Sequence, residues 1–508
     1  MKKNLLIFLL FFLSSLVILL LAPGLLDPDG FYHIKISQMM AESLSLIKNF
    51  PWLNFTILKD SFTDHHFLFH VLAIPFILIS PIIGMKIFIS ILIGGFFTFF
   101  YFLLKRLDIK YPFFWTLLLL ASGSFIFRLL LLKAISFSLI FLFLGFYFLK
   151  EKKYLRLFIL SFFLVWSYGG FLIISAIAFF FFISEIFLIN KKEWRFIFIP
   201  LSGTATGIVL NFYFPQNLEF LKTQAFQIPL LNGLLAKVSV GAEWYPYHFK
   251  EFLAGNFLLW LVFAGIIATL IFYRKEIKKR VSTEGLSAVF LSGFFFVLMV
   301  RSNRFVEYWV PFTILAGALI TRDFRIDKKL FDFLKMSFIS KGPSLASKGR
   351  TLANWRWLPI SAALLPVSIF FINSIADNYL ALKNTPPYDR YKSASEWLIQ
   401  NTPEKSIVFN VSWDDFPELF FWDTHNYYIV GMDPTFMYEY DKTLYEKWCK
   451  VGEGEDPKPG ETAKKYFQAS AIFINKEKNP RLYEIAQKDQ ILKKSYEDNW
   501  VIIYKIEN

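Results

Sequence analysis

The sequence is dominated by apolar stretches, many of them as long as a helix that crosses a bilayer. A backbone in the lipid core must satisfy its own hydrogen bonds, so such a chain folds as a bundle of α-helices. Hydrophobic residues fill 55% of the 508 positions and charged residues only 19%, whereas soluble proteins contain about a quarter. These proportions exclude a soluble enzyme, a disordered chain and a nucleic-acid-binding module.

Membrane-spanning helices are predicted at eleven places. Residues 4–22 are followed by Pro-Gly-Leu-Leu-Asp and not by a small-x-small cleavage site, so we expect a helix and not a cleaved signal peptide. The apolar stretch 67–83 is expected to be a re-entrant or interfacial helix, because a further span there would move basic loops outside. The predicted spans are 4–22, 84–104, 112–127, 134–149, 155–167, 170–189, 196–213, 256–273, 284–300, 305–321 and 357–375.

The net charge of +14 is expected to reflect membrane topology, because basic loops stay in the cytoplasm. The basic stretch 322–356 is then a cytoplasmic linker that touches anionic lipid headgroups.

After residue 375 the composition changes, and short apolar runs alternate with helical patterns, which predicts an α/β domain over 376–508. An odd number of spans places this domain on the extracytoplasmic side. A single cysteine, Cys449, excludes a disulfide framework or a thiolate metal cluster.

Histidines and carboxylates gather in the loops predicted to be external. Asp29 and His33 are four apart and share a face if that stretch is helical, whereas Asp27 is equally well read as a helix cap. Carboxylate oxygen with imidazole suits Mn²⁺ or Mg²⁺, although imidazole alone favours softer metals. The later candidates in the same loop are Asp64, His65, His66 and His70.

Two arginines interrupt the apolar pattern at the outer end of a helix pair. Arg301 and Arg304 lie on the side where the positive-inside rule disfavours basic residues, so an anionic ligand is one explanation. Pairing with Glu307 is the structural alternative.

These motifs together resemble the GT-C superfamily of membrane glycosyltransferases, and within it the catalytic subunit of oligosaccharyltransferase. Asp27-Pro28-Asp29-Gly30-Phe31-Tyr32-His33 is similar to the first acidic motif of that family, Val240-Gly241-Ala242-Glu243-Trp244-Tyr245-Pro246 to its external-loop glutamate motif, and Trp166-Ser167-Tyr168-Gly169-Gly170 to its aromatic-glycine turn. Asn303-Arg304-Phe305 resembles the stretch whose arginine holds the lipid pyrophosphate.

The resemblance implies a role for each matching position. Asp29 would bind a divalent cation, Mn²⁺ or Mg²⁺, and help to activate the acceptor. Glu243 would share in catalysis and metal binding. Arg304 would hold the donor phosphate, with Arg301 as a helper. Where the family has a second acidic pair, this sequence has Arg128 and Lys133 with no carboxylate between them. The candidates for completing the metal site are therefore Asp64, His65 and His66.

The acceptor-side signature of the family is matched only in part. Trp413, Asp414 and Asp415 partly resemble its Trp-Trp-Asp motif, so the acceptor is left open as a protein or a glycan.

The sequence thus predicts a transmembrane GT-C-like catalytic domain over 1–375, followed by an extracytoplasmic domain over 376–508. Its expected activity is oligosaccharyltransferase-like transfer of a sugar from a polyprenyl-phosphate or polyprenyl-pyrophosphate donor, with no nucleic-acid partner. A donor with its tail in lipid and its sugar in water needs a lipid-facing groove beside a polar external site. The alternatives are a polytopic lipid or sugar transporter or flippase, and a non-catalytic receptor, but the spans are nearly free of mid-helix charge and show no internal repeat.

The predicted topology can be tested with protease. Added to sealed, right-side-out cells, protease should release residues 376–508, because the same topology puts them on the face that carries Asp29 and Glu243. Protection of this domain, with cleavage in 322–356 instead, would contradict the topology.

Overall fold

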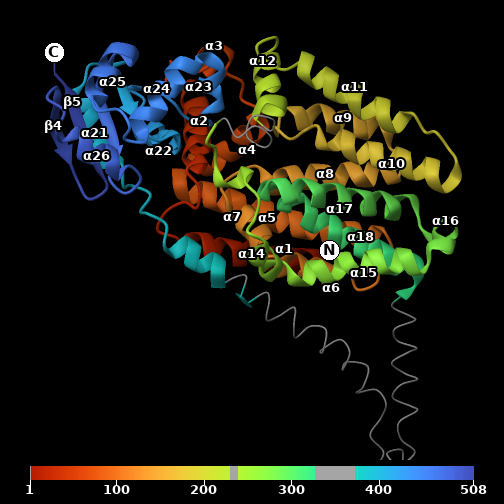
Figure 1. Ribbon diagram of the computed structural model, residues 1–508. Helices are drawn as coiled ribbons and strands as arrows, with labels where there is room; N and C mark the ends of the chain where they lie inside the picture. Colours follow the sequence, from red (N-terminus) through yellow and green to blue (C-terminus); the bar gives the residue numbers. More distant parts are fainter. Residues whose placement is uncertain (1, 229–237, 327–371, 374–375, 508) are drawn as a thin grey trace, which may run out of the picture.

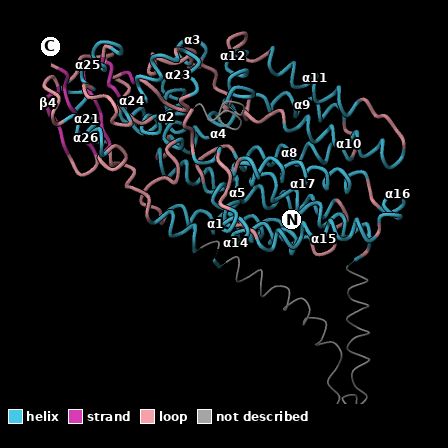
Figure 2. Tube along the Cα trace, viewed as in Figure 1, coloured by secondary structure: helices cyan, strands magenta, loops and turns pink. Residues whose placement is uncertain are grey.

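A computed structural model describes residues 2–228, 238–326, 372–373 and 376–507. Long helices lie side by side across Figure 1, and a smaller domain that contains the C-terminus sits at one end of them. Figure 2 shows the strands confined to that smaller domain. The predicted span 357–375 and most of the predicted linker 322–356 lie outside the described residues.

The predicted spans that fall within the described part of the chain form helices, but few are long enough to cross a membrane by themselves. Among the described residues, three helices are sufficiently long and apolar, and five are if each bent pair is counted as one span. The count of eleven spans is therefore not confirmed. The unbroken helices found at the predicted spans are α1 (Lys2–Leu20), α5 (Pro81–Arg106), α8 (Ile135–Lys150), α9 (Tyr154–Val165), α10 (Ile173–Ile189), α11 (Arg195–Val209), α15 (Phe257–Phe272), α17 (Thr283–Arg301) and α18 (Val306–Phe324).

The stretch predicted as one span over 112–127 is instead a broken helix. α6 (Pro112–Leu117) continues as the 3-10 turn η1 (Leu118–Ala121), and α7 (Gly123–Leu130) follows after an 86° bend. At the break, the Ser122 side chain accepts from the Phe125 N–H at 3.2 Å and donates to Asn256 Oδ1 at 2.6 Å. Ser122 is thus an N-cap that turns α7 in a new direction.

Helix α18 forms the core of the membrane part. Every residue from Val306 to Ile320 is buried. By contrast, only 22% of the apolar window of α1 is buried, which fits a helix that faces lipid. Glu307, in the first turn of α18, is therefore surrounded by protein.

Short helices cover the end of the bundle beside the smaller domain. The stretch 67–83 contains α4 (Phe67–Ile77), whose 11 residues are about 17 Å long and too short to span a membrane. It packs against α2 and α5. The other short helices are α2 (Asp29–Ser43), α3 (Leu58–Ser61), α12 (Asn217–Lys222), η2 (Thr223–Gln227), η4 (Ala242–Trp244), α14 (Phe249–Gly255) and η6 (Asn303–Phe305), and η5 (Arg274–Glu276) and α16 (Ile277–Arg280) follow α15.

The C-terminal domain is the expected α/β unit, built on a five-stranded sheet of order β2-β1-β3-β5-β4. β1 pairs in parallel with β2 and β3, and β5 pairs antiparallel with β3 and β4. The strands are β1 (Ile407–Asn410), β2 (Tyr427–Tyr428), β3 (Ala469–Asn475), β4 (Leu492–Glu497) and β5 (Val501–Ile506). The helices are α21 (Lys392–Asn401), η8 (Trp413–Asp415), α22 (Phe416–Trp422), α23 (Thr435–Tyr440), α24 (Lys442–Gly452), α25 (Pro459–Phe467) and α26 (Pro480–Ala486).

The first loop of the membrane part is bonded directly to this domain. Tyr428 N–H donates to the Trp52 carbonyl at 2.7 Å, and the Trp52 indole donates to the Thr424 carbonyl at 2.9 Å. Phe50 stacks among the aromatic rings of α22, at 5.3 Å from Phe420. Backbone bonds and aromatic packing therefore hold the domain against the same end of the bundle as α2.

Candidate active site

A cavity of about 860 Å³ lies where the helix bundle meets the C-terminal domain. This volume is within the range of small-molecule sites. The charged side chains that line it are Asp27, Asp29, Arg128, Lys133, Glu243, Arg304, Asp377, Asp414 and Asp433. The structure thus places Asp29, Glu243 and Arg304, three of the site residues expected from the sequence, in the lining of one cavity from three separate segments.

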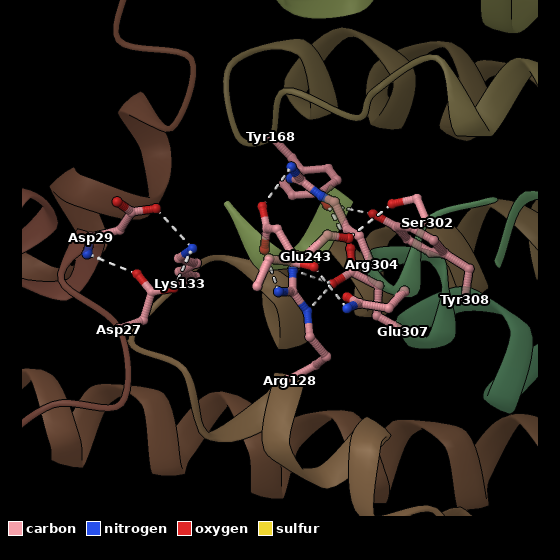
Figure 3. Close-up of polar contacts among 12 residues, drawn as sticks. Asp27, Asp29, Arg128, Lys133, Tyr168, Glu243, Ser302, Arg304, Glu307 and Tyr308 are labelled. Carbon is pink, nitrogen blue, oxygen red and sulfur yellow. Dashed lines mark hydrogen bonds and ion pairs between the residues drawn. The ribbon is translucent and has the colours of Figure 1, made fainter. Parts of the chain in front are cut away.

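Asp29 stands at the start of α2 and is paired with a lysine. Lys133 Nζ lies 2.7 Å from Asp29 Oδ2 and 2.9 Å from Asp27 Oδ2 (Figure 3). Asp27 also caps the helix, since its Oδ1 accepts from the Asp29 N–H at 2.8 Å. Burial raises the pKa of Asp29 to about 6, although Lys133 opposes the rise.

Glu243, in η4, is gripped by two arginines. Its Oε1 accepts from Arg304 Nη1 at 3.2 Å, and its Oε2 accepts from Arg128 Nη1. Burial favours a higher pKa for Glu243, but Arg128, Lys133 and Arg304 outweigh burial and hold the pKa well below its ordinary value. The carboxylate is therefore ionised, and each of its two oxygens accepts a hydrogen bond from an arginine.

Arg128 extends this chain of charges into the core. Its Nε and Nη2 donate to Glu307 Oε2 at 3.1 and 3.0 Å, and Glu307 is fully buried. Tyr168, in the aromatic-glycine turn, donates to Glu307 Oε1 at 3.0 Å, and its hydroxyl also bonds that of Tyr308. Figure 3 shows the resulting series Glu307–Arg128–Glu243–Arg304. Arg304 therefore pairs with Glu243, and the Glu307 pairing considered from the sequence belongs to Arg128.

The two arginines of the predicted phosphate motif have different surroundings. Arg304 lines the cavity, and its guanidinium lies 5.1 Å from the Trp244 ring. Arg301, at the end of α17, is exposed and does not line the cavity. Ser302 and Asn303 donate to the carbonyls of Glu243 and Ala242, both at 2.9 Å, so this motif also positions the glutamate loop.

Three of the histidines, His33, His65 and His66, line the cavity. Asp64 Oδ2 lies 2.8 Å from His70 Nδ1, and His70 Nε2 lies 2.7 Å from His33 Nδ1. A carboxylate only accepts, so His70 donates to Asp64 from Nδ1. Burial lowers the pKa of His33 well below the ordinary value, so its ring is neutral.

The divalent-cation site expected from Asp29, Glu243, Asp64, His65 and His66 is not assembled. Across the described residues, no group of three or more histidine, cysteine or acidic side chains is arranged to hold a metal ion. The physical reason is that the carboxylates are already engaged: Asp29 by Lys133, Glu243 by two arginines, and Asp64 by His70 and by the His66 N–H at 3.0 Å. Of the expected ligands, only the Nδ1 atoms of His65 and His66 are buried without a hydrogen-bond partner.

The acceptor-side candidates of the C-terminal domain separate into two environments. Trp413 and Asp414 line the cavity, where the Trp413 ring packs against Gly241. Asp415 is buried inside the domain and accepts from the Tyr391 hydroxyl and from Lys478, each at 2.8 Å. Asp414 and Trp413 are therefore placed to meet a bound molecule, whereas Asp415 anchors η8.

Solved structures that share the fold include two archaeal oligosaccharyltransferase structures and one of ArnT. The oligosaccharyltransferase of Archaeoglobus fulgidus in its apo form has a TM-score of 0.67 and 13% identity, over 96% of this chain and 71% of that chain. The oligosaccharyltransferase AglB of A. fulgidus, in complex with an inhibitory peptide and a dolichol-phosphate, has a TM-score of 0.65 and 13% identity, over 95% and 71%. ArnT from Cupriavidus metallidurans, bound to undecaprenyl phosphate, has a TM-score of 0.56 and 14% identity, over 98% and 97%. The chain has a GT-C fold.

The sequence itself matches no known family or curated protein. At 13–14% identity, the likeness to the solved GT-C structures shows the fold alone.

Sequence reasoning did not identify some of the polar residues of this GT-C site. Asp433, from the loop after β2, lines the cavity, and burial raises its pKa to about 6. Asp377 and Asn378 also line the cavity. No motif marks these positions. The Met-Asp-Pro sequence around Asp433 resembles an ordinary turn, so the residue could be assigned to the site only once the domain was docked.

The Arg128–Glu307 pair should dominate the stability of the site. Arg128→Met leaves the fully buried Glu307 carboxylate without its positively charged partner, which costs about 3–5 kcal/mol. Removing both charges in Arg128→Met with Glu307→Gln should restore much of the loss. Thermal unfolding in detergent, followed by tryptophan fluorescence, measures both variants.

The exposed pair Arg280–Glu276 is the matched control. Arg280→Met should leave the unfolding temperature almost unchanged, because exposed ion pairs contribute about 0–1 kcal/mol. Equal losses for Arg128→Met and Arg280→Met, or strictly additive losses in the double variant, would show that the buried pair does not hold the site together.

Proposed function

We propose that this chain is a membrane glycosyltransferase that moves a sugar or oligosaccharide from a polyprenyl-phosphate or polyprenyl-pyrophosphate donor to an acceptor on the extracytoplasmic side. The observation that carries the proposal is one cavity with a carboxylate, Asp29, on one wall and an arginine, Arg304, on another. The GT-C fold supports it, because two structures with this fold were solved with dolichol-phosphate or undecaprenyl phosphate.

Arg304 is suited to bind the donor phosphate. Among the described residues its only hydrogen-bond partner is Glu243, which takes Nη1. The edge of the guanidinium that carries Nε and Nη2 remains for a phosphate, to which it can donate two parallel bonds. The guanidinium also makes a cation–π contact with the Trp244 ring, which helps to hold it at the cavity. Arg301 is exposed and does not line the cavity, so the proposal rests on Arg304.

An apolar groove beside the cavity suits the polyprenyl tail. The groove has a volume of about 480 Å³ and lies among α4, α8 and α9. Leu68 in the groove is two residues beyond His66 in the cavity, and Phe137 is two residues beyond Ile135. The first residues of α4 and α8 therefore lie near both the cavity and the groove, an arrangement that suits a donor with its phosphate in the cavity and its tail in lipid. Its lining residues are Leu68, Val71, Leu72, Phe137, Phe141, Leu144, Phe148, Arg156, Ile159, Leu160 and Phe163.

The proposed reaction displaces the lipid phosphate from the sugar. An acceptor hydroxyl or amide attacks the anomeric carbon, the bond from that carbon to the phosphate oxygen breaks, and the phosphate leaves with the electron pair. Asp29 takes the proton of the acceptor, and Arg304 balances the charge that develops on the phosphate. Glu243 keeps Arg304 and Arg128 in place, while Asp414 and Asp433 face the acceptor from the C-terminal domain.

Transfer from a labelled polyprenyl-phosphate sugar, measured as a function of donor concentration, tests this assignment. Arg304→Lys keeps the charge but loses the planar fork, so the apparent donor affinity should fall roughly ten- to hundredfold, which corresponds to the about 1.5–3 kcal/mol of a charge-assisted hydrogen bond. Asp29→Asn should reduce the turnover rate far more than the donor affinity.

Arg301→Ala is the comparison at the same edge of the bundle and should affect donor affinity much less than Arg304→Lys. Unfolding temperatures are recorded for all variants. Wild-type donor affinity in Arg304→Lys together with a lower unfolding temperature would make Arg304 only a structural partner of Glu243. Donor binding without any transfer, by a chain that instead moves the lipid across vesicle membranes, would favour a flippase.

A further inference from the structure

Lys133 occupies the point at which the carboxylates of the first acidic motif converge. It follows the end of α7 closely, and its Nζ contacts Asp27 and Asp29 at 2.9 and 2.7 Å. The Lys133 side chain is only 15% exposed and lines the cavity. A cation is therefore built into the chain where the GT-C resemblance places a divalent metal ion.

The electrostatic surroundings keep this lysine charged. Burial by itself lowers the pKa of Lys133, but Asp27, Asp29 and Glu243 outweigh burial and raise it above the ordinary value. An ammonium group has three N–H donors, and within the described part of the chain two of them are taken by the aspartates. The third can reach an acceptor in the cavity, such as a phosphate oxygen.

The same lysine is incompatible with a divalent ion on these ligands. An ion bound between Asp27 and Asp29 would meet the ammonium at short range, with no acidic side chain from the segment 128–136 to compensate. Each oxygen of Glu243 already accepts a hydrogen bond from an arginine, so an ion bound there would also lie close to two guanidinium groups. Arg128 and Lys133 stand where the resemblance places the second acidic pair. They also form ion pairs with the other carboxylates of the cavity, Lys133 with Asp27 and Asp29 and Arg128 with Glu243.

We propose that the Lys133 ammonium is the permanent cation of this site in place of a divalent metal ion, and that sugar transfer by this chain is independent of metal. The inference rests on the proposed transferase function and deepens it. Lys133 acts as a positioning residue for Asp29, and it supplies positive charge toward the leaving phosphate together with Arg304.

The first test compares transfer by the metal-free and metal-supplemented protein. The purified full chain is stripped with a chelator and assayed without metal and with added Mn²⁺ or Mg²⁺. We expect equal rates, within about twofold. Lys133→Met should lose transfer by at least about tenfold, Lys133→Arg should keep a large part of it, and the exposed Lys59→Met should match the wild type.

The second test reads metal binding directly, so it holds even if no transfer is detected. Mn²⁺ binding is followed by electron paramagnetic resonance for the wild type and for Lys133→Asp, which removes the ammonium and restores an acidic residue. We expect no saturable binding by the wild type at micromolar Mn²⁺, and one site in Lys133→Asp that is lost when Asp29→Asn is added.

Two results would overturn the inference. One is wild-type transfer that the chelator abolishes and Mn²⁺ restores. The other is a Mn²⁺ site in the wild type that Asp29→Asn removes. A protein that binds no Mn²⁺ and transfers no sugar would contradict the proposed function while leaving the charge assignment of Lys133 supported by the Lys133→Asp comparison.

Discussion

The bond that the candidate site depends on is the one between Arg128 and the buried Glu307. Glu307 is fully buried at the start of α18, and burying its charge without a positively charged partner would cost several kcal/mol. The break in the helix at Ser122 turns α7 so that Arg128 reaches this carboxylate. The same guanidinium reaches outward to Glu243, which in turn holds Arg304. Three segments that are far apart in the sequence are thereby fixed around one cavity, and the orientation of the proposed phosphate-binding arginine follows from a charge in the core.

The distribution of charge gives the cavity its particular chemistry. Two basic side chains, Arg128 and Lys133, stand where the resemblance leads one to expect acidic ligands, and each is paired with carboxylates of the cavity. Lys133 holds both Asp27 and Asp29, two arginines hold Glu243, and Asp29 is the carboxylate that we propose as the proton acceptor. Next to the cavity, the groove among α4, α8 and α9 offers no charged side chain except Arg156, which suits a hydrocarbon tail.

Local pattern predicted the elements of the fold well and their contacts poorly. Apolar runs marked helices of the bundle and, at 406–411, 427–430, 471–474 and 501–504, four of the five strands, but β4, which reads Leu-Lys-Lys-Ser-Tyr-Glu, is a charged edge strand with no apolar run. The break near residue 122 was missed because the mostly apolar pattern continues across it. The Ser122 cap on Phe125 is local, whereas the bond from Ser122 to Asn256, 134 residues away, is a tertiary contact. Motifs identified Asp29, Glu243 and Arg304, whereas the pairings of Arg128 with Glu307 and of Lys133 with Asp29 are tertiary contacts that no spacing reveals. The predicted divalent-cation site is not confirmed for the same reason, since the expected ligands were chosen without the cations that engage them.

The most direct test of the account is a cryo-electron microscopy map of the full chain with a polyprenyl phosphate, prepared in the presence of Mn²⁺. We expect the phosphate in the cavity within hydrogen-bonding distance of Arg304 and the Lys133 ammonium, the tail in the groove that begins at Leu68 and Phe137, and Asp29 still bonded to Lys133. A phosphate bound away from Arg304, or an ion coordinated by Asp29 and Glu243 with Lys133 displaced, would contradict it.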